Sequence, residues 1–537
     1  MMPNQSAPTP RADTAWVFVA ICLLILTPIV HQALVIGYSL FNFDGLIILL
    51  GVSFFSVPLV LLARIRGNLS YTIIVGAVTS LLADYFLAKQ PEVALWLAGV
   101  SLGVYVLLWK LGPKSAQIIT TFAIAFVAAD YTVAHTQVLR HVNGERSSSP
   151  IDSPIFRSTQ PVIHLVFDAF QAPSALPIEQ RETAKYVRSF FVNNGFRLYD
   201  NAFSRHNRTH QSLSAALNFD ATPDSLNHLA PQVSNATAFE HSLGQNLVLT
   251  TATNAGLEAH LVQSAYMNFC PSTADAIVSE CFTYSKNTLP RNMMLHLTLA
   301  NRLEMLLLLV AQESFIFNYA KKQLNAVFND IIPYVRSPLT SFTAHDITNN
   351  LIKTAKAETY IFTHSLISHS PYALDQNCLI QPVENWANDG GNKTSQQRKI
   401  AYQLYSHQIK CSLLQIAGIL EKISQNPALK DALIIIHGDH ASRLSRRRAD
   451  FRAGDDLSTN DVLDNFPVLF AIKHPNTEPG ISSVQVALDT LLAHHLGQME
   501  VAPYTGVPDD YIYLLQANGE LSKTSFDMKT MLDTRLK

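Results

Sequence analysis

The sequence predicts an α-helical membrane domain of five spans, followed by an α/β domain with a mostly parallel sheet between helices and a small C-terminal β hairpin. Three observations lead to this fold class. Long apolar segments fill the first part of the chain, as bilayer-spanning helices require. Later apolar runs are short, end in Asp or His, and alternate with helical stretches, which is typical of parallel strands. Near the C-terminus, two β-prone runs flank Asn518-Gly519, a hairpin turn signal.

The N-terminal quarter of the 537-residue chain contains five apolar segments, at 15–38, 45–63, 71–87, 93–111 and 116–133. Each is near the ~20 residues that a helix needs to cross a bilayer. The segments have almost no polar face, which argues against the buried helices of a soluble protein. We therefore expect a multi-pass membrane protein.

The basic residues orient these spans. Cytoplasmic loops are enriched in Lys and Arg, and the loops that would share one side carry Arg11, Arg64, Arg66, Lys110 and Lys114. The loops on the other side carry no basic residue except Lys89. An odd number of spans in the cytoplasmic (inner) membrane then places the rest of the chain outside, in the periplasm or extracellular space.

The cysteines agree with an external C-terminal half. Cys22 lies in the first span, and the other four are Cys270, Cys281, Cys378 and Cys411. An even number of cysteines in an oxidising compartment favours disulfides. Three pairings are possible, and we prefer the two that join neighbours in sequence. The formal net charge of −2 argues against a nucleic-acid partner.

We divide the chain into a transmembrane domain (1–140), a linker (141–160) and an extracytoplasmic domain (161–537). An apolar stretch at 293–317 is interrupted by charges, and we expect a helix on the bilayer surface or under an insertion rather than a sixth span. Helices are predicted just after Arg208 and over 397–424, and the hairpin strands at 511–515 and 521–524. The other predicted strands are 162–167, 197–199, 259–262, 359–363, 433–436 and 468–472.

Three predicted strands end in residues that suit a metal or a phosphate. Asp168 ends the strand 162–167, Asp439 and His440 follow 433–436, and His364 and His369 follow 359–363. Ligands of open α/β sheets bind beyond the carboxyl ends of strands, so these side chains should converge. Carboxylate and imidazole ligands suit zinc, whereas a more oxygen-rich site would suit calcium or magnesium.

Thr209 lies where an extended segment enters a helix. A hydroxyl there can cap the helix, which is one interpretation. The other is a nucleophile, because the free N–H groups of a helix N-terminus favour anions. A bound dication would lower the pKa of the Thr209 hydroxyl and hold its oxygen in place. In that interpretation, the metal ligands are Asp168, Thr209, Asp439 and His440.

The ordered set of Asp168, Thr209, His369 in a His-Ser-Pro-Tyr turn, and Asp439-His440 resembles the alkaline phosphatase/sulfatase superfamily. With the N-terminal spans, the chain is similar to the membrane phosphoethanolamine and phosphoglycerol transferases, which carry a sulfatase-like domain. The resemblance implies an alkaline phosphatase-like fold that covers residues ~160 to ~475, and a divalent metal: zinc, calcium or manganese.

The resemblance also implies a covalent, ping-pong mechanism. Thr209 would take a phospho-headgroup from a phospholipid donor and pass it to an envelope glycan, a lipid acceptor or water. His369 would bind the transferred group or a second metal, and His364 would have a similar role.

The sequence departs from the superfamily at two places. Sulfatases carry Cys/Ser-x-Pro-x-Arg, where this chain has Thr209-His-Gln-Ser212, so sulfate hydrolysis by that route is not expected. The transferases usually have Gly after Asp-His, where this chain has Ala441, followed by Ser442 and Arg443. Arg443 begins a basic run that is either a solvated loop or a clamp for an anionic substrate or lipid surface.

Two alternatives stay open at this point. One is a sulfuric-ester or phosphodiester hydrolase of the same fold. The other is a non-catalytic envelope assembly protein that keeps the fold but not the chemistry. The presence of all four residues Asp168, Thr209, Asp439 and His440 favours an enzyme.

Overall fold

The computed structural model describes residues 11–35, 43–64, 68–87, short stretches between 105 and 124, 160–230, 240–270, 278–284, 294, 296–313, 337–387, 394–445, 457–497, 502–515 and 520–535. The chain forms two compact units. The first comprises Met1–Arg140 and Arg291–Val335, and the second comprises His141–Pro290 and Arg336–Lys537. The segment Arg291–Val335 thus groups with the N-terminal helices, whereas the division made from the sequence left it in the second domain.

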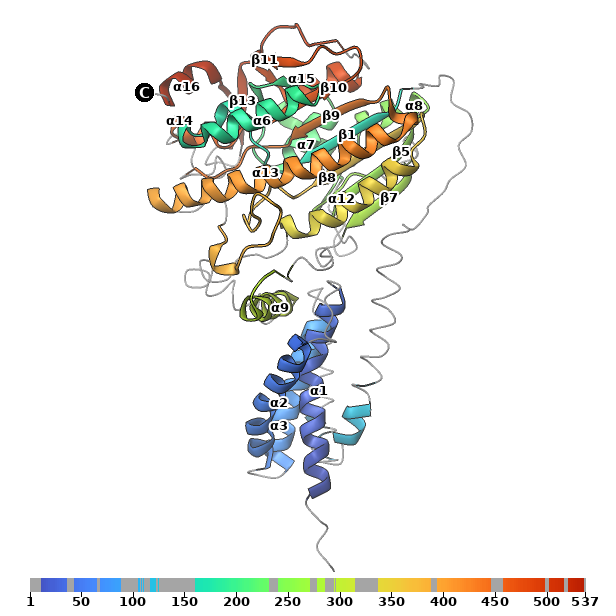
Figure 1. Cartoon of the computed structure of the whole chain (residues 1–537), viewed down its shortest axis with the longest axis vertical. Helices are drawn as coiled ribbons and strands as arrows, with labels where there is room; N and C mark the ends of the chain where they lie inside the picture. Colours follow the sequence, from blue (N-terminus) through green and yellow to red (C-terminus); the bar gives the residue numbers. More distant parts are fainter. Residues whose placement is uncertain are drawn as a thin grey trace, which may run out of the picture. The chain divides into compact units, whose positions relative to one another are not determined.

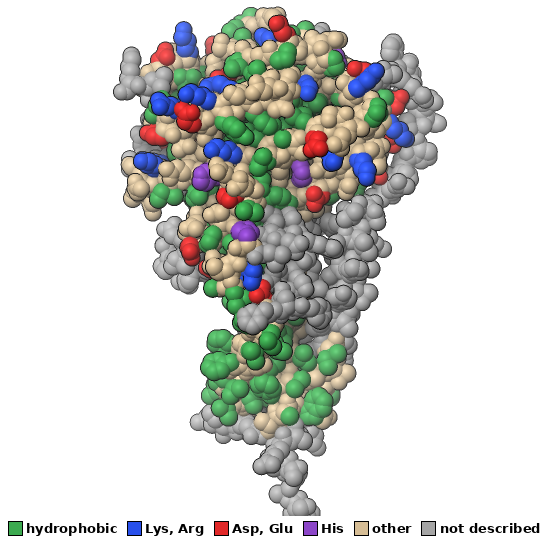
Figure 2. Space-filling view, in the orientation of Figure 1, with side chains coloured by type: hydrophobic (Ala, Val, Ile, Leu, Met, Phe, Trp, Pro, Cys, Tyr) green, Lys and Arg blue, Asp and Glu red, His purple; other side chains and the backbone are tan. Residues whose placement is uncertain are grey.

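The first unit is built from the apolar helices α1 (Arg11–Val35), α2 (Phe43–Arg64) and α3 (Asn68–Leu87), with α9 (Leu299–Glu313) packed on α1 and α3. Hydrophobic side chains gather over the surface of this unit (Figure 2), and Phe54 of α2 is 77% exposed. A surface this apolar is suited to lipid rather than water.

Two of the described helices are long and apolar enough to cross a bilayer, over Thr14–Ala33 and Asp44–Ala63. The structure thus gives two candidate spans among the described residues, where the sequence predicted five. Helix α3 coincides with the third predicted segment. The segments 93–111 and 116–133 lie largely outside the described residues.

Helix α9 forms where the sequence predicted a helix at 293–317. Its Arg302 donates to Asp44 of α2 at 2.9 Å, and the Asp44 side chain is only 6% exposed. A charge this buried is stabilised by its partner. The ion pair therefore anchors α9 within the first unit.

The second unit is an α/β domain around an eight-stranded sheet with the order β11-β2-β10-β9-β1-β8-β5-β7 (Figure 1). Among these strands β10 alone is antiparallel to its neighbours. The strands are β1 Val162–Phe167, β2 Arg197–Tyr199, β5 Glu258–Ser264, β7 Val278–Tyr284, β8 Thr359–Ser365, β9 Leu433–Gly438, β10 Phe470–Lys473 and β11 Gly480–Ser482.

Helices cover both faces of the sheet. Side chains from α7, α8 and α15 join alternate residues of the strands in one core cluster, while α6, α12 and α13 pack together with the strands on the other face (Figure 1). These helices are α6 Arg181–Asn193, α7 Thr209–Leu217, α8 Leu247–Asn254, α12 Ser337–Thr354, α13 Ser395–Gln425 and α15 Leu488–Leu492.

Smaller elements complete the unit. Short strand pairs are β3 Ala202–Phe203 with β12 Val486–Ala487, β4 His241–Ser242 with β6 Met267–Asn268, and β13 Tyr511–Leu515 with β14 Leu521–Ser525. The remaining described helices of this unit are α14 Thr459–Leu463 and α16 Met528–Arg535, with short 3-10 or π-helical segments at Pro173–Ala175, Ile178–Gln180, Pro223–His228, Val383–Asn385, Pro427–Leu429 and Ala493–Gly497.

The predicted α/β architecture is confirmed. Each of the six predicted strands coincides with an observed one, and the predicted helices correspond to α7 and α13. The C-terminal hairpin is antiparallel, although its Asn518-Gly519 turn lies outside the described residues. The disulfides join Cys270 to Cys281 and Cys378 to Cys411, the pairing preferred from the sequence.

The central strands bring their carboxyl ends to one level. Strand β1 lies between β8 and β9, and Phe167 at its end is opposite both Ser365 and Gly438. The residues that follow β1 and β9, Asp168 and Asp439, therefore leave the sheet side by side. Because of this register, residues that follow different strands in the sequence lie close together in space.

Gly438 lets the chain after β1 pass close to β9. A methyl group at this position would collide with the backbone carbonyl of Phe170, which cannot move as a flexible side chain can. We expect Gly438→Ala to lower the free energy of unfolding by about 2 kcal/mol and to weaken metal binding, because Asp439 would shift. Chemical denaturation and metal analysis would measure both effects.

Gly418→Ala in α13 is the matched control. Its added methyl would lie in ordinary contact, 3.6 Å from His345. A helix-interior alanine should leave the protein equally or slightly more stable. If Gly438→Ala unfolded and bound metal as the parent protein does, close packing of Gly438 on Phe170 would not be a constraint on the site.

Candidate metal-dependent active site

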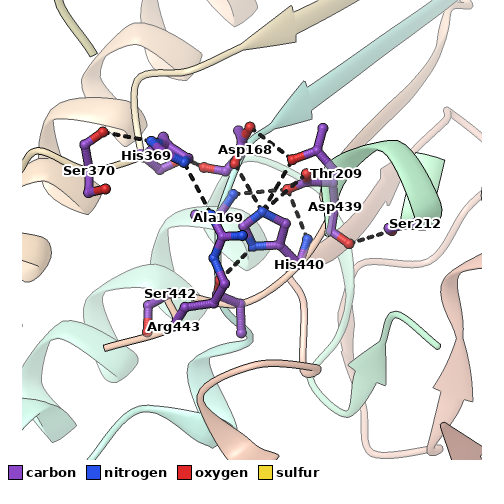
Figure 3. Close-up of polar contacts among 12 residues, drawn as sticks. Asp168, Ala169, Thr209, Ser212, His369, Ser370, Asp439, His440, Ser442 and Arg443 are labelled. Carbon is purple, nitrogen blue, oxygen red and sulfur yellow. Dashed lines mark hydrogen bonds and ion pairs between the residues drawn. The ribbon is translucent and has the colours of Figure 1, made fainter. Parts of the chain in front are cut away.

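The cluster at the strand ends contains Asp168, Asp439, His440 and Thr209 (Figure 3). His440 Nε2 lies 3.3 Å from Asp168 Oδ1 and 3.5 Å from Asp439 Oδ2. Thr209 Oγ1 is 3.3 Å from both Asp168 Oδ2 and His440 Nε2. The structure therefore brings together the four residues that the sequence assigned to the metal site, which are separated by up to 272 positions in the chain.

Thr209 is the first residue of α7, and it does not cap this helix. The N-cap position belongs to Arg208, which makes no side-chain cap bond. The Thr209 hydroxyl instead faces Asp168 and His440, while the side chain remains only 5% exposed. Between the two interpretations of Thr209, this geometry favours the nucleophile.

The start of α7 is tied directly to the end of β9. Ser212, one turn after Thr209, donates its hydroxyl to the backbone oxygen of Asp439 at 2.6 Å. Ser204 in turn donates to Ser212 Oγ at 2.7 Å. These buried bonds fix Thr209 relative to the metal-site carboxylate, which is the positioning that a nucleophile requires.

Buried oxygens in the cluster indicate a cation. Asp168 Oδ1 and Asp439 Oδ2 accept no hydrogen bond although both are buried. Asp439 Oδ1 is satisfied by the backbone N–H groups of Ala169 and His440, at 2.9 and 2.8 Å. Carboxylate oxygens that converge in a buried place without donors repel one another unless a cation lies between them.

The His440 ring is in the tautomer that a metal requires. Its Nδ1 lies 2.7 Å from the Ala441 backbone oxygen, which only accepts, so Nδ1 carries the proton. Nε2 is the ring nitrogen left for a metal, and it faces the two carboxylates. An outer hydrogen bond from Nδ1 of this kind is usual for ligating histidines. Asp168, Asp439 and His440 form the one group of three or more potential metal ligands among the described residues. The donor set fits zinc or another divalent ion.

Asp168 is ionised at neutral pH. Burial alone would raise the pKa of this carboxyl group, but the nearby His369, His440 and His364 together hold its pKa below the ordinary value. A carboxylate that stays charged can both ligate a cation and accept a hydrogen bond from the Thr209 hydroxyl.

His369 and Arg443 meet at the rim of the cluster (Figure 3). Arg443 Nη2 lies 3.2 Å from His369 Nε2, although the two residues are 74 positions apart. Arg443 thus belongs to the site, as the clamp interpretation of the basic run requires. Residues 446–448, the rest of that run, lie outside the described residues.

Two further histidines, His364 and His164, have different surroundings. His364 is fully buried with its Nε2 3.7 Å from Asp168 Oδ2, and neither ring nitrogen makes a hydrogen bond. This place favours contact with Asp168 over contact with a substrate. His164 of β1 is a buried core residue, with its ring nitrogens 3.0 Å from Tyr360 Oη and 2.7 Å from His437 Nε2.

Three residues near the site were not found from the sequence. Ser212 supports Asp439, and its spacing of three from Thr209 on one helix face was the available signal. Tyr266 bonds His210 at 3.1 Å, and the His210 ring stacks on His241 at a centroid distance of 4.1 Å. No sequence motif includes Tyr266 or His241, because these residues contact His210, the residue after Thr209, only in the folded chain.

Comparison with protein-family models and with curated proteins found no match. Among solved structures, the chain is similar to the phosphonate monoester hydrolase of Agrobacterium radiobacter, with 13% identity over 66% of this chain and 80% of that one (TM-score 0.36). It is also similar to the C-terminal periplasmic domain of EcEptC from Escherichia coli in complex with Zn, with 10% identity over 71% and 95% (TM-score 0.40).

A third similar structure is the C-terminal periplasmic domain of the phosphoethanolamine transferase EptC from Campylobacter jejuni, with 10% identity over 64% of this chain and 90% of that one (TM-score 0.35). These proteins are of the superfamily that the sequence motifs resemble. At such TM-scores the similarity gives no evidence about the reaction. The chemistry is inferred from the geometry of Asp168, Thr209, Asp439 and His440.

Asp439→Asn should abolish metal binding. The change keeps the shape of the side chain and removes the charge, so we expect zinc affinity to fall by more than ~100-fold, beyond the effect of outer-shell changes. Metal analysis after dialysis would measure the occupancy. Asp431→Asn is the control, because that side chain is 63% exposed. Equal zinc content in Asp439→Asn and the parent protein would exclude this ligand set.

Proposed function

We propose that this chain is a membrane-anchored member of the alkaline phosphatase/sulfatase superfamily that transfers a phospho-headgroup through Thr209. One observation carries the proposal: the Thr209 hydroxyl lies 3.3 Å from both Asp168 and His440, within a buried group of metal-ligating side chains. The Thr209 hydroxyl does not cap α7, so helix capping does not account for its position among these groups.

The residues divide the reaction into two halves. In the first, Thr209 Oγ forms a bond to phosphorus, the ester bond to the donor breaks, and the leaving alkoxide takes up a proton. In the second, an acceptor hydroxyl attacks the phosphothreonine, and Thr209 Oγ leaves and regains its proton. Such covalent catalysis replaces one difficult displacement by two easier ones. With water as the acceptor, the same residues would perform hydrolysis.

Asp168, Asp439, His440 and Thr209 are the residues that would hold the metal ion. A divalent ion supplies positive charge that lowers the pKa of a bound hydroxyl and offsets charge on a phosphate. Asp168 Oδ2 accepts the Thr209 hydrogen bond and so orients the oxygen for attack. Zinc is our first choice of metal, with manganese, calcium and magnesium as alternatives.

The donor we propose is a phospholipid, and the acceptor an envelope glycan or a lipid. Two apolar N-terminal helices support a membrane location. The two disulfides support a catalytic unit outside the cytoplasm, where oxidised cysteines persist. A catalytic domain at the outer face of the cytoplasmic membrane would meet both substrates.

Intact-mass analysis of the full-length protein after incubation with membrane phospholipids tests the proposal. We expect the parent protein to gain the mass of one phospho-headgroup, and the gain would identify that headgroup. Thr209→Ala should gain none, and its turnover should fall by about 10³-fold or more, as loss of a nucleophile does in other covalent enzymes.

Thr209→Ser is the matched control, because it retains a hydroxyl at the same atom. It should form the adduct more slowly. An adduct of equal mass and yield on Thr209→Ala would show that the nucleophile is a different residue. Release of the headgroup to water in the absence of any acceptor would indicate a hydrolase.

A further inference from the structure

We propose that the guanidinium of Arg443 occupies the place of a second metal ion, so that the site holds one divalent ion and one arginine. This inference rests on the proposed function and deepens it. It assigns the metal count of the site and identifies the group that recognises the transferred phosphate. Three features of the structure lead to it, beginning with the proton on His369.

The lone pair of His369 is already in use. His369 Nδ1 lies 2.6 Å from the backbone oxygen of Ser370, which accepts, so Nδ1 carries the ring proton. Arg443 Nη2 lies 3.2 Å from Nε2, and because a guanidinium can only donate, Nε2 is the acceptor of this hydrogen bond. Arginine remains charged in proteins, so a metal ion at this nitrogen would have to displace a cation.

His369 and His440 make an instructive contrast. Both rings donate from Nδ1 to a backbone oxygen one residue later, and both present Nε2 to the site. His440 Nε2 faces two carboxylates, at 3.3 and 3.5 Å. His369 Nε2 faces a guanidinium. His440 therefore presents its Nε2 to a place where a metal ion can bind. His369 presents the same atom to the guanidinium of Arg443, a cation that belongs to the chain.

The backbone holds Arg443 in this place. Its φ of 54° lies in the left-handed region, which is uncommon for a residue other than glycine. The Arg443 N–H donates to the Asp464 backbone oxygen at 2.6 Å, and the Ala441 N–H donates to that of Asn465 at 3.1 Å. A strained residue held by such bonds at a site is a candidate for function.

A guanidinium suits the substrate that we propose. Its planar fork of N–H groups matches the oxygens of a phosphate and can donate to two of them at once. Arg443 would therefore bind the non-bridging oxygens of the group that Thr209 attacks. The site would therefore select tetrahedral anionic esters, and Arg443 would not distinguish among the headgroups attached to them.

Zinc stoichiometry of the full-length protein in detergent tests the inference. We expect one zinc per chain for the parent protein and two for Arg443→Gly, because removing the side chain frees His369 Nε2 to act as a ligand. Glycine is chosen since it adopts a φ of 54° without strain. The double variant Arg443→Gly/His369→Ala should return to one zinc, and equilibrium dialysis with metal analysis would measure all three.

A second measurement uses inorganic phosphate as the probe. Its affinity for the zinc-loaded protein should fall about tenfold or more in Arg443→Gly, the usual loss for a hydrogen bond to a charged group. Arg443→Lys, which keeps a cation, should bind one zinc and lose less phosphate affinity. Arg181→Ala is the control for loss of an arginine, because Arg181 is 69% exposed. Circular dichroism would confirm that each variant is folded.

Two zinc ions on the parent protein, or one on folded Arg443→Gly, would overturn the inference and leave the proposed function intact. Unchanged phosphate affinity in Arg443→Gly would likewise exclude the arginine as the phosphate ligand. A parent protein that binds no zinc or other divalent ion would contradict the proposed function as well.

Discussion

Two buried carboxylates that face one imidazole are the constraint on which the rest of this domain depends. Asp168 is 2% exposed, and Asp439 and His440 are fully buried. Removing a carboxylate from water costs several kcal/mol unless its charge is balanced. Backbone N–H groups satisfy one oxygen of Asp439, and the remaining oxygens have no protein donor of comparable strength. Binding of a cation is therefore coupled to the stability of the folded domain.

The sheet makes this arrangement possible by holding the strand ends at one level, and the loops beyond it are fixed by distant elements. Ser368 donates to the Asp168 backbone oxygen at 2.7 Å. Tyr405 of α13 donates to the oxygen of Ala169 at 2.8 Å. Ala169, with a φ of 63°, is in the same left-handed region as Arg443. Such backbone conformations cost about 1–3 kcal/mol each and persist only where surrounding contacts impose them. Ala169 directly follows Asp168, and Arg443 lies three residues beyond His440, so both of these strained residues border the candidate metal site.

The sequence was sufficient for features that depend on local pattern. Apolar runs located the central strands, and parallel pairing then required Asp168 and Asp439 to meet. The contact of Arg443 with His369 depends on two loops 74 residues apart and on a backbone conformation that arginine seldom adopts, so no local signal could predict it. Tyr266 likewise reaches the site through tertiary packing alone. Hydropathy predicted five spans, of which two are long and apolar enough among the described helices.

Formal charge explains why an arginine suits this site better than a second ion. Asp168 and Asp439 contribute two negative charges, which one divalent cation neutralises. Arg443 then leaves the site with one positive charge, which balances the single negative charge of a phosphodiester. A second divalent ion in place of the guanidinium would leave a charge of plus two, with no further carboxylate in the described metal-ligand group to offset it. Arg443 lies three residues beyond His440 and contacts His369 Nε2 at 3.2 Å, so the positive charge is supplied by the chain itself.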